Sequence, residues 1–179
     1  NAGGRETLPA GGYVCQIVNA RVEEAEWGDT LIIAHDVCEG DYSGIFKRDY
    51  DQNTMENKKW RGIFKINVPK DDGTEQDAWT KRRFGNTIWA IEQSNPGFKW
   101  NWQEDKLIGC RFGATLQEEE YEKNDGGIGV KLVVKNIKTV KQIMDGDFKV
   151  PTTKKLERTA APVSDFAVLS DDEFAASLP

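Results

Sequence analysis

The sequence predicts a mainly β fold, a small Greek-key barrel of five or six strands with one helix, followed by an acidic C-terminal tail. Short runs rich in Val, Ile, Tyr and Phe recur along most of the chain, with Gly, Asn and Asp turns between them. One internal stretch has helical spacing instead, and the C-terminal residues lose both patterns. No internal repeat is visible, which removes solenoids and propellers.

The N-terminal part predicts a hairpin and a further strand. The runs YVCQIVNARVEE and TLIIAHDV flank a turn at residues 26–29 and should pair with each other. The run IFKRDYD over residues 45–51 alternates and predicts a continuation of this sheet or a separate strand. WRGIFKINV over residues 60–68 alternates cleanly, which places Phe64 and Ile66 on one face and Lys65 on the other.

The second half predicts one helix and a hairpin. Residues 74–94 have helical periodicity, and the Asn-Pro-Gly sequence that follows ends the helix. CRFGATLQEEEYE and IGVKLVVKNIKTV then flank a Gly-rich turn at residues 124–127. In the helix we expect Phe84, Trp89 and Ile91 to pack in the core. We expect the loop aromatics Phe98, Trp100 and Trp102 to cap the end of the helix, and we leave Trp79 unassigned.

A helix between the third and fourth main strands matches the five-stranded barrel called the oligonucleotide/oligosaccharide-binding, or OB, fold. A β-sandwich with an inserted helix is the alternative. The expected body is residues 1–158, with 24 basic and 26 acidic residues, and the tail is residues 159–179, with four acidic residues and no basic one. The net charge of −6 is thus concentrated in the tail. A flexible conformation is expected for such a segment.

Composition excludes several classes of protein. Three cysteines without a C-x-x-C pair argue against a disulfide framework and a thiolate zinc site, and they favour a reducing cytoplasm. No apolar run approaches the length of a membrane span, and no leader pattern opens the chain.

Catalytic motifs are weak or missing, so we predict no enzyme activity, no catalytic residues, no cofactor and no metal. The only histidine, His35, lies in the apolar second strand and is interpreted as a semi-buried structural residue with its hydrogen bonds satisfied. Asp49 and Asp51 could share a strand face and hold Mg²⁺, but solvated carboxylates are the favoured interpretation. Short (D/E)-x-K matches occur three times and carry little information, and no phosphate-binding glycine loop is present.

Aromatic and basic residues are interleaved between residues 46 and 65, which is typical of proteins that bind single-stranded nucleic acid by base stacking and phosphate contact. Trp60 and Tyr50 are the favoured stacking residues, whereas Phe46 and Phe64 are also compatible with a core role. Lysines of the last strand could line the far wall of a groove or protect a sheet edge. The candidate nucleic-acid-binding residues are Lys47, Arg48, Tyr50, Lys58, Lys59, Trp60, Arg61, Phe64 and Lys65.

The chain also resembles a family of phage-encoded OB-fold single-stranded-DNA-binding proteins that were formerly of unknown function. The resemblance is carried by GDYSGIFKRDYD, KKWRGIFKINVP, AIEQSNPGFKWNWQEDKLIG and DGDFKVPTTKKL, which cover most of the body. It implies a non-enzymatic protein that coats single-stranded DNA during phage replication or recombination in the cytoplasm of a bacterial host. A homo-oligomer is compatible with it.

The tail resembles the acidic tail of bacterial single-stranded-DNA-binding proteins, which recruits replication and repair enzymes. The candidate partner-binding residues are Asp171, Asp172, Glu173 and Phe174. The bacterial tails end in Ile-Pro-Phe, whereas no aromatic residue follows Pro179 in this sequence. The alternative function is a protein-interaction module, or an inhibitor of a host enzyme, that acts through its acidic surface and tail.

Overall fold

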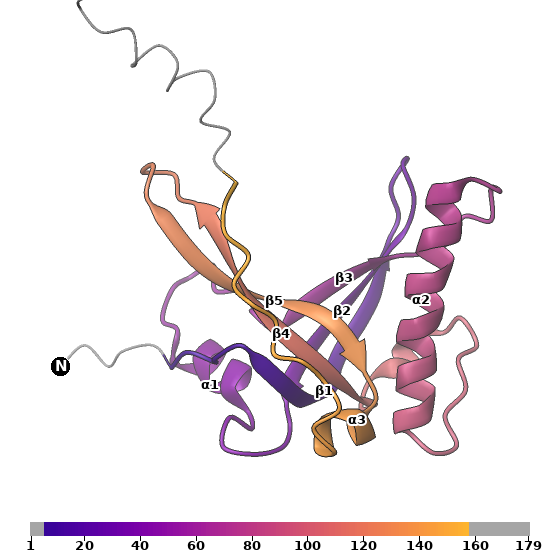
Figure 1. Cartoon of the computed structure of the whole chain (residues 1–179), viewed down its shortest axis with the longest axis horizontal. Helices are drawn as coiled ribbons and strands as arrows, with labels where there is room; N and C mark the ends of the chain where they lie inside the picture. Colours follow the sequence, from indigo (N-terminus) through magenta and orange to yellow (C-terminus); the bar gives the residue numbers. More distant parts are fainter. Residues whose placement is uncertain (1–5, 158–179) are drawn as a thin grey trace, which may run out of the picture.

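The computed structural model describes residues 6–157 as a twisted five-stranded antiparallel sheet with helices packed around it (Figure 1). The strands are β1 (Gly11–Glu23), β2 (Thr30–Val37), β3 (Ile63–Asn67), β4 (Arg111–Glu122) and β5 (Ile128–Lys138). The helices are α1 (Ile45–Gln52), α2 (Glu75–Ser94), the short 3₁₀ helix η1 (Glu104–Leu107) and α3 (Val140–Met144).

The strand order is β3-β2-β1-β4-β5, and the sheet is not closed into a barrel. Every ladder is antiparallel, and within residues 6–157 no ladder joins β3 to β5. The long helix α2 lies between β3 and β4 in the chain, as the sequence predicts. The prediction of a closed barrel is therefore replaced by an open sheet whose two outer strands are β3 and β5.

The core lies between the inner face of the sheet and α2. Ile17, Ile33 and Phe112 contribute from three neighbouring strands, and each is at most 1 % exposed. Phe84 and Ile91 of α2 are also buried, which confirms their predicted core role. Burial of such apolar side chains stabilises the fold by roughly 1.5–3 kcal/mol each.

The prediction of a strand over residues 45–51 is wrong, because this segment forms helix α1. The carboxylate of Asp36 accepts hydrogen bonds from the backbone N–H groups of Phe46 (2.9 Å) and Lys47 (3.0 Å), which satisfies donors in the first turn of the helix. Only Ile45 and Phe46 of α1 are buried. Strand β3 accordingly begins at Ile63 rather than at Trp60.

The segment after α3 runs along β4 beyond the point where β1 ends. The pairing of β1 with β4 stops at Leu116. Farther out, the Lys154 N–H donates to the Glu118 carbonyl (2.8 Å), and the Glu120 N–H donates to the Lys154 carbonyl (2.9 Å). The body thus continues to the last described residues, close to the predicted boundary at residue 158. The predicted tail, residues 159–179, lies outside the described residues.

None of the helices within residues 6–157 combines the length and the apolar character needed to span a bilayer.

Candidate nucleic-acid interface

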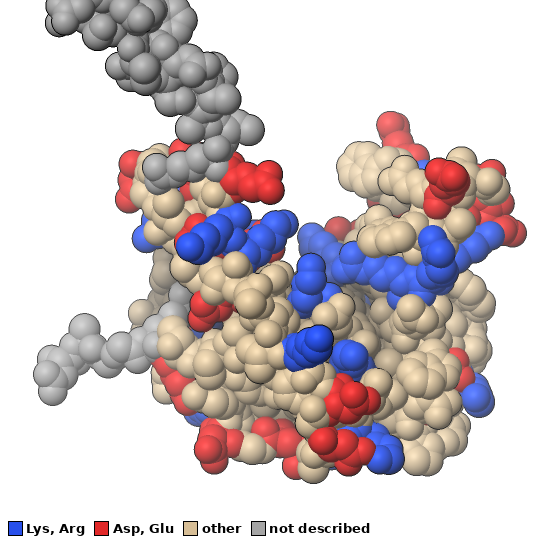
Figure 2. All heavy atoms as spheres, viewed as in Figure 1, with Lys and Arg blue, Asp and Glu red and all other residues tan. Residues whose placement is uncertain are grey.

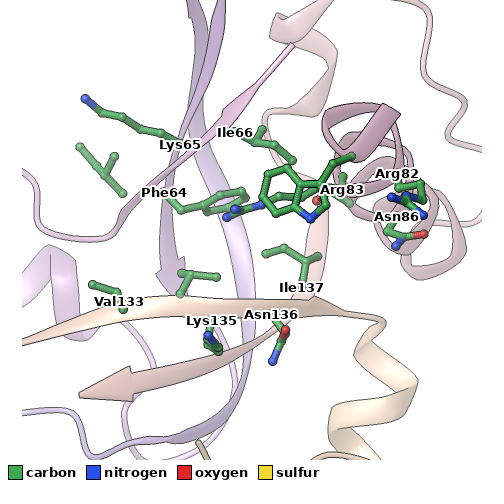
Figure 3. Close-up of a pocket in the computed structure, with 14 residues that line it drawn as sticks. Phe64, Lys65, Ile66, Arg82, Arg83, Asn86, Val133, Lys135, Asn136 and Ile137 are labelled. Carbon is green, nitrogen blue, oxygen red and sulfur yellow. Dashed lines mark hydrogen bonds between the residues drawn. The ribbon is translucent and has the colours of Figure 1, made fainter. Parts of the chain in front are cut away.

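A groove of about 720 Å³ separates the two outer strands of the sheet and is bounded on one side by α2. Figure 3 shows Phe64 of β3 and Ile137 of β5 pointing into this space, with Arg82 and Asn86 on α2 at one end. We call it the β3–α2–β5 groove. Its lining residues are Ile63, Phe64, Lys65, Ile66, Trp79, Arg82, Arg83, Asn86, Thr87, Val133, Val134, Lys135, Asn136 and Ile137.

The charge of the groove is entirely positive. Lys65, Arg82, Arg83 and Lys135 line it, and no carboxylate does. None of these four cations forms an ion pair with another residue of the described range 6–157. Figure 2 shows basic side chains on both sides of the hollow between the β4–β5 hairpin and α2, whereas acidic side chains gather at the tips and the lower rim. The cations are therefore available to an anionic ligand.

Aromatic faces accompany the cations. Trp79 on α2 is 53 % exposed, and the Arg83 guanidinium lies 5.5 Å from its ring centroid. Phe64 is half-buried at the floor, where its ring packs 5.6 Å from that of Phe112. A flat ligand group can lie on the indole of Trp79, whereas Phe64 gives the groove an apolar base.

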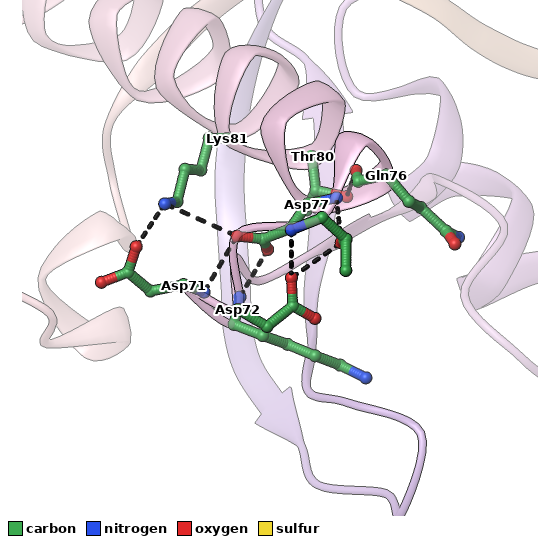
Figure 4. Close-up of polar contacts among 8 residues, drawn as sticks. Asp71, Asp72, Gln76, Asp77, Thr80 and Lys81 are labelled. Carbon is green, nitrogen blue, oxygen red and sulfur yellow. Dashed lines mark hydrogen bonds and ion pairs between the residues drawn. The ribbon is translucent and has the colours of Figure 1, made fainter.

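The position of α2 along the groove is fixed by the loop between β3 and the helix (Figure 4). Thr74 caps α2 by accepting from the Asp77 N–H. The buried carboxylate of Asp77 accepts in turn from the backbone N–H groups of Lys70 (2.7 Å) and Asp71 (2.9 Å). Lys81 forms ion pairs with both Asp71 and Asp77. This network ties the first turn of α2 to the end of β3, which places Trp79, Arg82 and Arg83 along the same groove as β3.

Two of the nine predicted nucleic-acid-binding residues, Phe64 and Lys65, line the groove. Three others lie on or beside α1 and have their charges paired: Lys47 with Asp51 (2.6 Å), Arg48 with Glu6 (3.1 Å) and Arg61 with Asp49 (2.7 Å). The structure does not bring these three residues into the groove.

Tyr50 and Trp60, the favoured stacking residues, pack against each other with ring centroids 5.8 Å apart. Both are half-buried. The indole N–H of Trp60 donates to the His35 carbonyl (2.9 Å), and Lys58 Nζ lies 4.3 Å from the Tyr50 ring centroid. Lys59 is exposed next to them. We call Tyr50, Lys58, Lys59 and Trp60 the α1 cluster, which is a second aromatic and basic surface outside the groove.

The sequence predicts no nucleic-acid-binding residue on α2. The last two residues of the basic run at residues 81–83 follow Trp79 by one helical turn, so these side chains lie on the same side of the helix. This spacing is the sequence signal that could identify α2 as one side of the groove. From the sequence, Lys135 is only one of several lysines on the last strand. Trp89, predicted in the core, is 55 % exposed, because it follows the buried Ile88 by one residue and is turned about 100° away from it.

The loop aromatics cover the middle of α2 rather than its end. The Trp102 ring is stacked on Phe84, with a centroid distance of 5.6 Å and an interplanar angle of 8°. Trp100 also packs against the core and contacts Phe84 edge-on. Trp102 remains 64 % exposed, so the predicted cap is formed only in part.

His35 differs from the prediction of a semi-buried residue with satisfied hydrogen bonds. It is 1 % exposed, and neither ring nitrogen has a hydrogen-bond partner among the described residues. The imidazole packs against Phe46, Phe64 and Phe112. Burial in this apolar cage lowers the pKa of His35 to about 4, so the ring is neutral at pH 7.

Metal-ligating and thiol groups are dispersed within residues 6–157. No group of three or more His, Cys, Asp and Glu side chains gathers there in a way that could hold a metal ion. Asp49 and Asp51 lie on helix α1 instead of a strand, and their carboxylates accept from Arg61 and Lys47. The three cysteines are free thiols, and burial raises the pKa of each above its ordinary value.

In comparisons with known proteins, no protein-family model and no curated protein matches this chain. The predicted partner-binding residues Asp171, Asp172, Glu173 and Phe174 lie outside the described residues.

Proposed function

We propose that the protein binds single-stranded nucleic acid in the β3–α2–β5 groove. The observation that carries this proposal is the combination, within residues 6–157, of four cations without an ion-pair partner, no lining carboxylate and an exposed indole around one apolar floor. The phosphates of a nucleic acid supply negative partners for these cations, and its unpaired bases supply flat faces that stack on aromatic rings.

The strand order supports a finer description of the fold. In a five-stranded OB barrel the helix lies between the third and fourth strands, and the third and fifth strands close the barrel. Here the same helix position occurs, and β3 and β5 are the outer strands on either side of the groove. We therefore propose an OB-like fold that is open along this seam.

The sequence resemblance to phage single-stranded-DNA-binding proteins completes the proposal. The protein coats single-stranded DNA during phage replication or recombination, and its acidic tail recruits partner proteins. No catalytic step is required for this role.

Titration of a fluorescent single-stranded oligonucleotide at low and high salt tests the site. Neutralisation of phosphates on single strands gives a salt slope of roughly −0.7 per contact, so four contacts give about −3. Affinity should then fall by about 50-fold between roughly 50 and 200 mM salt. The double variant Arg82→Ala, Arg83→Ala should bind more weakly and halve the slope.

Two control variants remove the same charge elsewhere. Lys99→Ala, Lys141→Ala removes two exposed lysines that pair with Glu92 and Asp145, and it should leave affinity unchanged. Lys58→Ala, Lys59→Ala probes the α1 cluster. If this variant lowered the slope and the arginine variant did not, the ligand would lie on the α1 cluster. Equal, negligible affinity for single and double strands would overturn the function itself.

A further inference from the structure

The open edges of β3 and β5 leave backbone hydrogen-bonding groups without a strand partner in the groove. Each of these strands pairs on one side only within residues 6–157. The groove is lined by four consecutive residues of β3, 63–66, and five consecutive residues of β5, 133–137. Main-chain groups of both strands therefore border the space in which the ligand is proposed to lie.

On β3 the ladder identifies which main-chain groups are open. Hydrogen bonds join His35 to Gly62 (2.7 Å) and Val68 to Asp29 (2.9 Å). The register between these bonds is continuous, so the even-numbered residues of β3 bond β2. The N–H and C=O of Lys65 consequently point away from β2, toward the open edge.

On β5 the same alternation applies. The Ile17 N–H donates to the Cys110 carbonyl (2.8 Å), so the even-numbered residues of β4 bond β1 and the odd-numbered ones bond β5. Asn136 and Lys138 are paired with Thr115 and Gly113 and are thus bonded to β4. Ile137 lies between them, and its N–H and C=O point toward the open edge.

The side chains on the floor of the groove have few free hydrogen-bonding groups. The Thr87 hydroxyl donates to the Arg83 carbonyl (3.0 Å), and the Asn136 amide donates to Thr115 Oγ1 (3.2 Å). Phe64, Ile66, Val134 and Ile137 are apolar. The main chain of the two edges therefore adds donors and acceptors beside this apolar floor.

We propose that these open strand edges receive the base edges of the bound strand, with Lys65 on β3 and Ile137 on β5 as contact points. This inference rests on the proposed function. Bases in a duplex already use their hydrogen-bonding edges for pairing, so the contact selects unpaired strands. The cations at the rim hold phosphate whether or not the bases are paired. The backbone contacts are what distinguishes single strands from duplexes.

An abasic oligonucleotide separates the two contributions, because it keeps every phosphate and lacks every base. We compare the full chain with thymidine and abasic oligonucleotides of equal length, about 16 nucleotides, which spans the site sizes of known OB folds. The thymidine oligonucleotide should bind at least tenfold more tightly. It should also slow amide hydrogen exchange at Lys65 and Ile137, whereas the abasic one should not.

A matched pair of variants that carry the same charge as each other tests the backbone contact. Lys65→Ala and Lys65→Pro both remove the ammonium, but only Pro removes the outward N–H. Proline is tolerated on an edge strand where the N–H makes no ladder bond, and circular dichroism would show whether the fold is kept. The Pro variant should lose more affinity for thymidine than the Ala variant, and the two should bind the abasic oligonucleotide equally.

Several results would overturn this inference. Tighter binding of thymidine with exchange at the two amides unchanged would assign the base contribution to stacking alone, which overturns this inference and leaves the proposed function intact. Equal affinity for the two oligonucleotides would exclude base-edge contacts and would also remove the stacking part of the proposed function. Slow exchange of both amides before any oligonucleotide is added, and no change afterwards, would indicate that a peptide strand covers the edges instead. If neither oligonucleotide bound, the proposed function would fail and this inference with it.

Discussion

At the scale of single residues, His35 is an ionisable side chain enclosed by three phenylalanine rings. Its pKa is lowered from 6.5 to about 4 by burial, so the unfolded chain binds more protons than the folded one between these two values. The contribution to stability is complete above pH 6.5 and is lost as the pH falls toward 4. The full difference corresponds to about 3 kcal/mol.

We therefore expect the free energy of unfolding, measured with denaturant, to fall from pH 7 to pH 4 more steeply in the wild type than in His35→Leu. The leucine variant replaces two unpartnered ring nitrogens with an apolar side chain, so it removes this titration. If both proteins lost stability in parallel, carboxylates rather than His35 would govern the acid response.

Trp79 is the residue on which a base is proposed to stack, and Trp89 on the same helix serves as the control position. The two indoles lie on the same helix and are 53 % and 55 % exposed, but only Trp79 lines the groove. Trp79→Ala should weaken single-strand binding by about 1–3 kcal/mol, the value of one stacked base, which is roughly 5- to 150-fold in Kd. Trp89→Ala should leave Kd unchanged in the same titration, and a loss of equal size in both variants would argue against stacking in the groove.

At the scale of elements, the joint between β3 and α2 depends on one buried carboxylate. Asp77→Ala would leave the backbone N–H groups of Lys70 and Asp71 without their acceptor and remove a partner of Lys81. Loss of such charged hydrogen bonds should cost about 2–4 kcal/mol in the free energy of unfolding, measured by urea denaturation. Asp72→Ala, an exposed neighbour that accepts only from Thr74, should cost less than about 1 kcal/mol. Similar losses in the two variants would contradict an anchoring role for Asp77.

The elements that the sequence predicts well are those whose pattern is complete within one segment. The β-rich apolar runs of β1 and β2, the two runs that flank the Gly-rich turn between β4 and β5, and the helical spacing of Phe84, Ile88 and Ile91 each lie within one segment. Helix α1 was missed because its alternation is ambiguous over so few residues, and because the carboxylate that satisfies its first turn comes from Asp36, on another element. No local pattern contains that information.

At the scale of the whole molecule, the groove arises from segments that are far apart in the sequence. Lys65, Arg83 and Lys135 line one groove only because the sheet order separates β3 from β5 and α2 packs beside both. The sequence showed each basic cluster but not which clusters meet. It therefore favoured the aromatic and basic residues between positions 46 and 65, where the signal is dense, over a site assembled from three distant parts.

The pairing of Lys154 with β4, together with the hydrogen bonds that residues 152–156 make to this strand, limits where the chain can be truncated. A truncation after α3 would strip the outer half of β4 of its neighbour and present bare main-chain groups to other molecules, a known route to self-association. Deletion of the acidic terminus must therefore leave Glu157 in place, otherwise precipitation could be mistaken for loss of a partner.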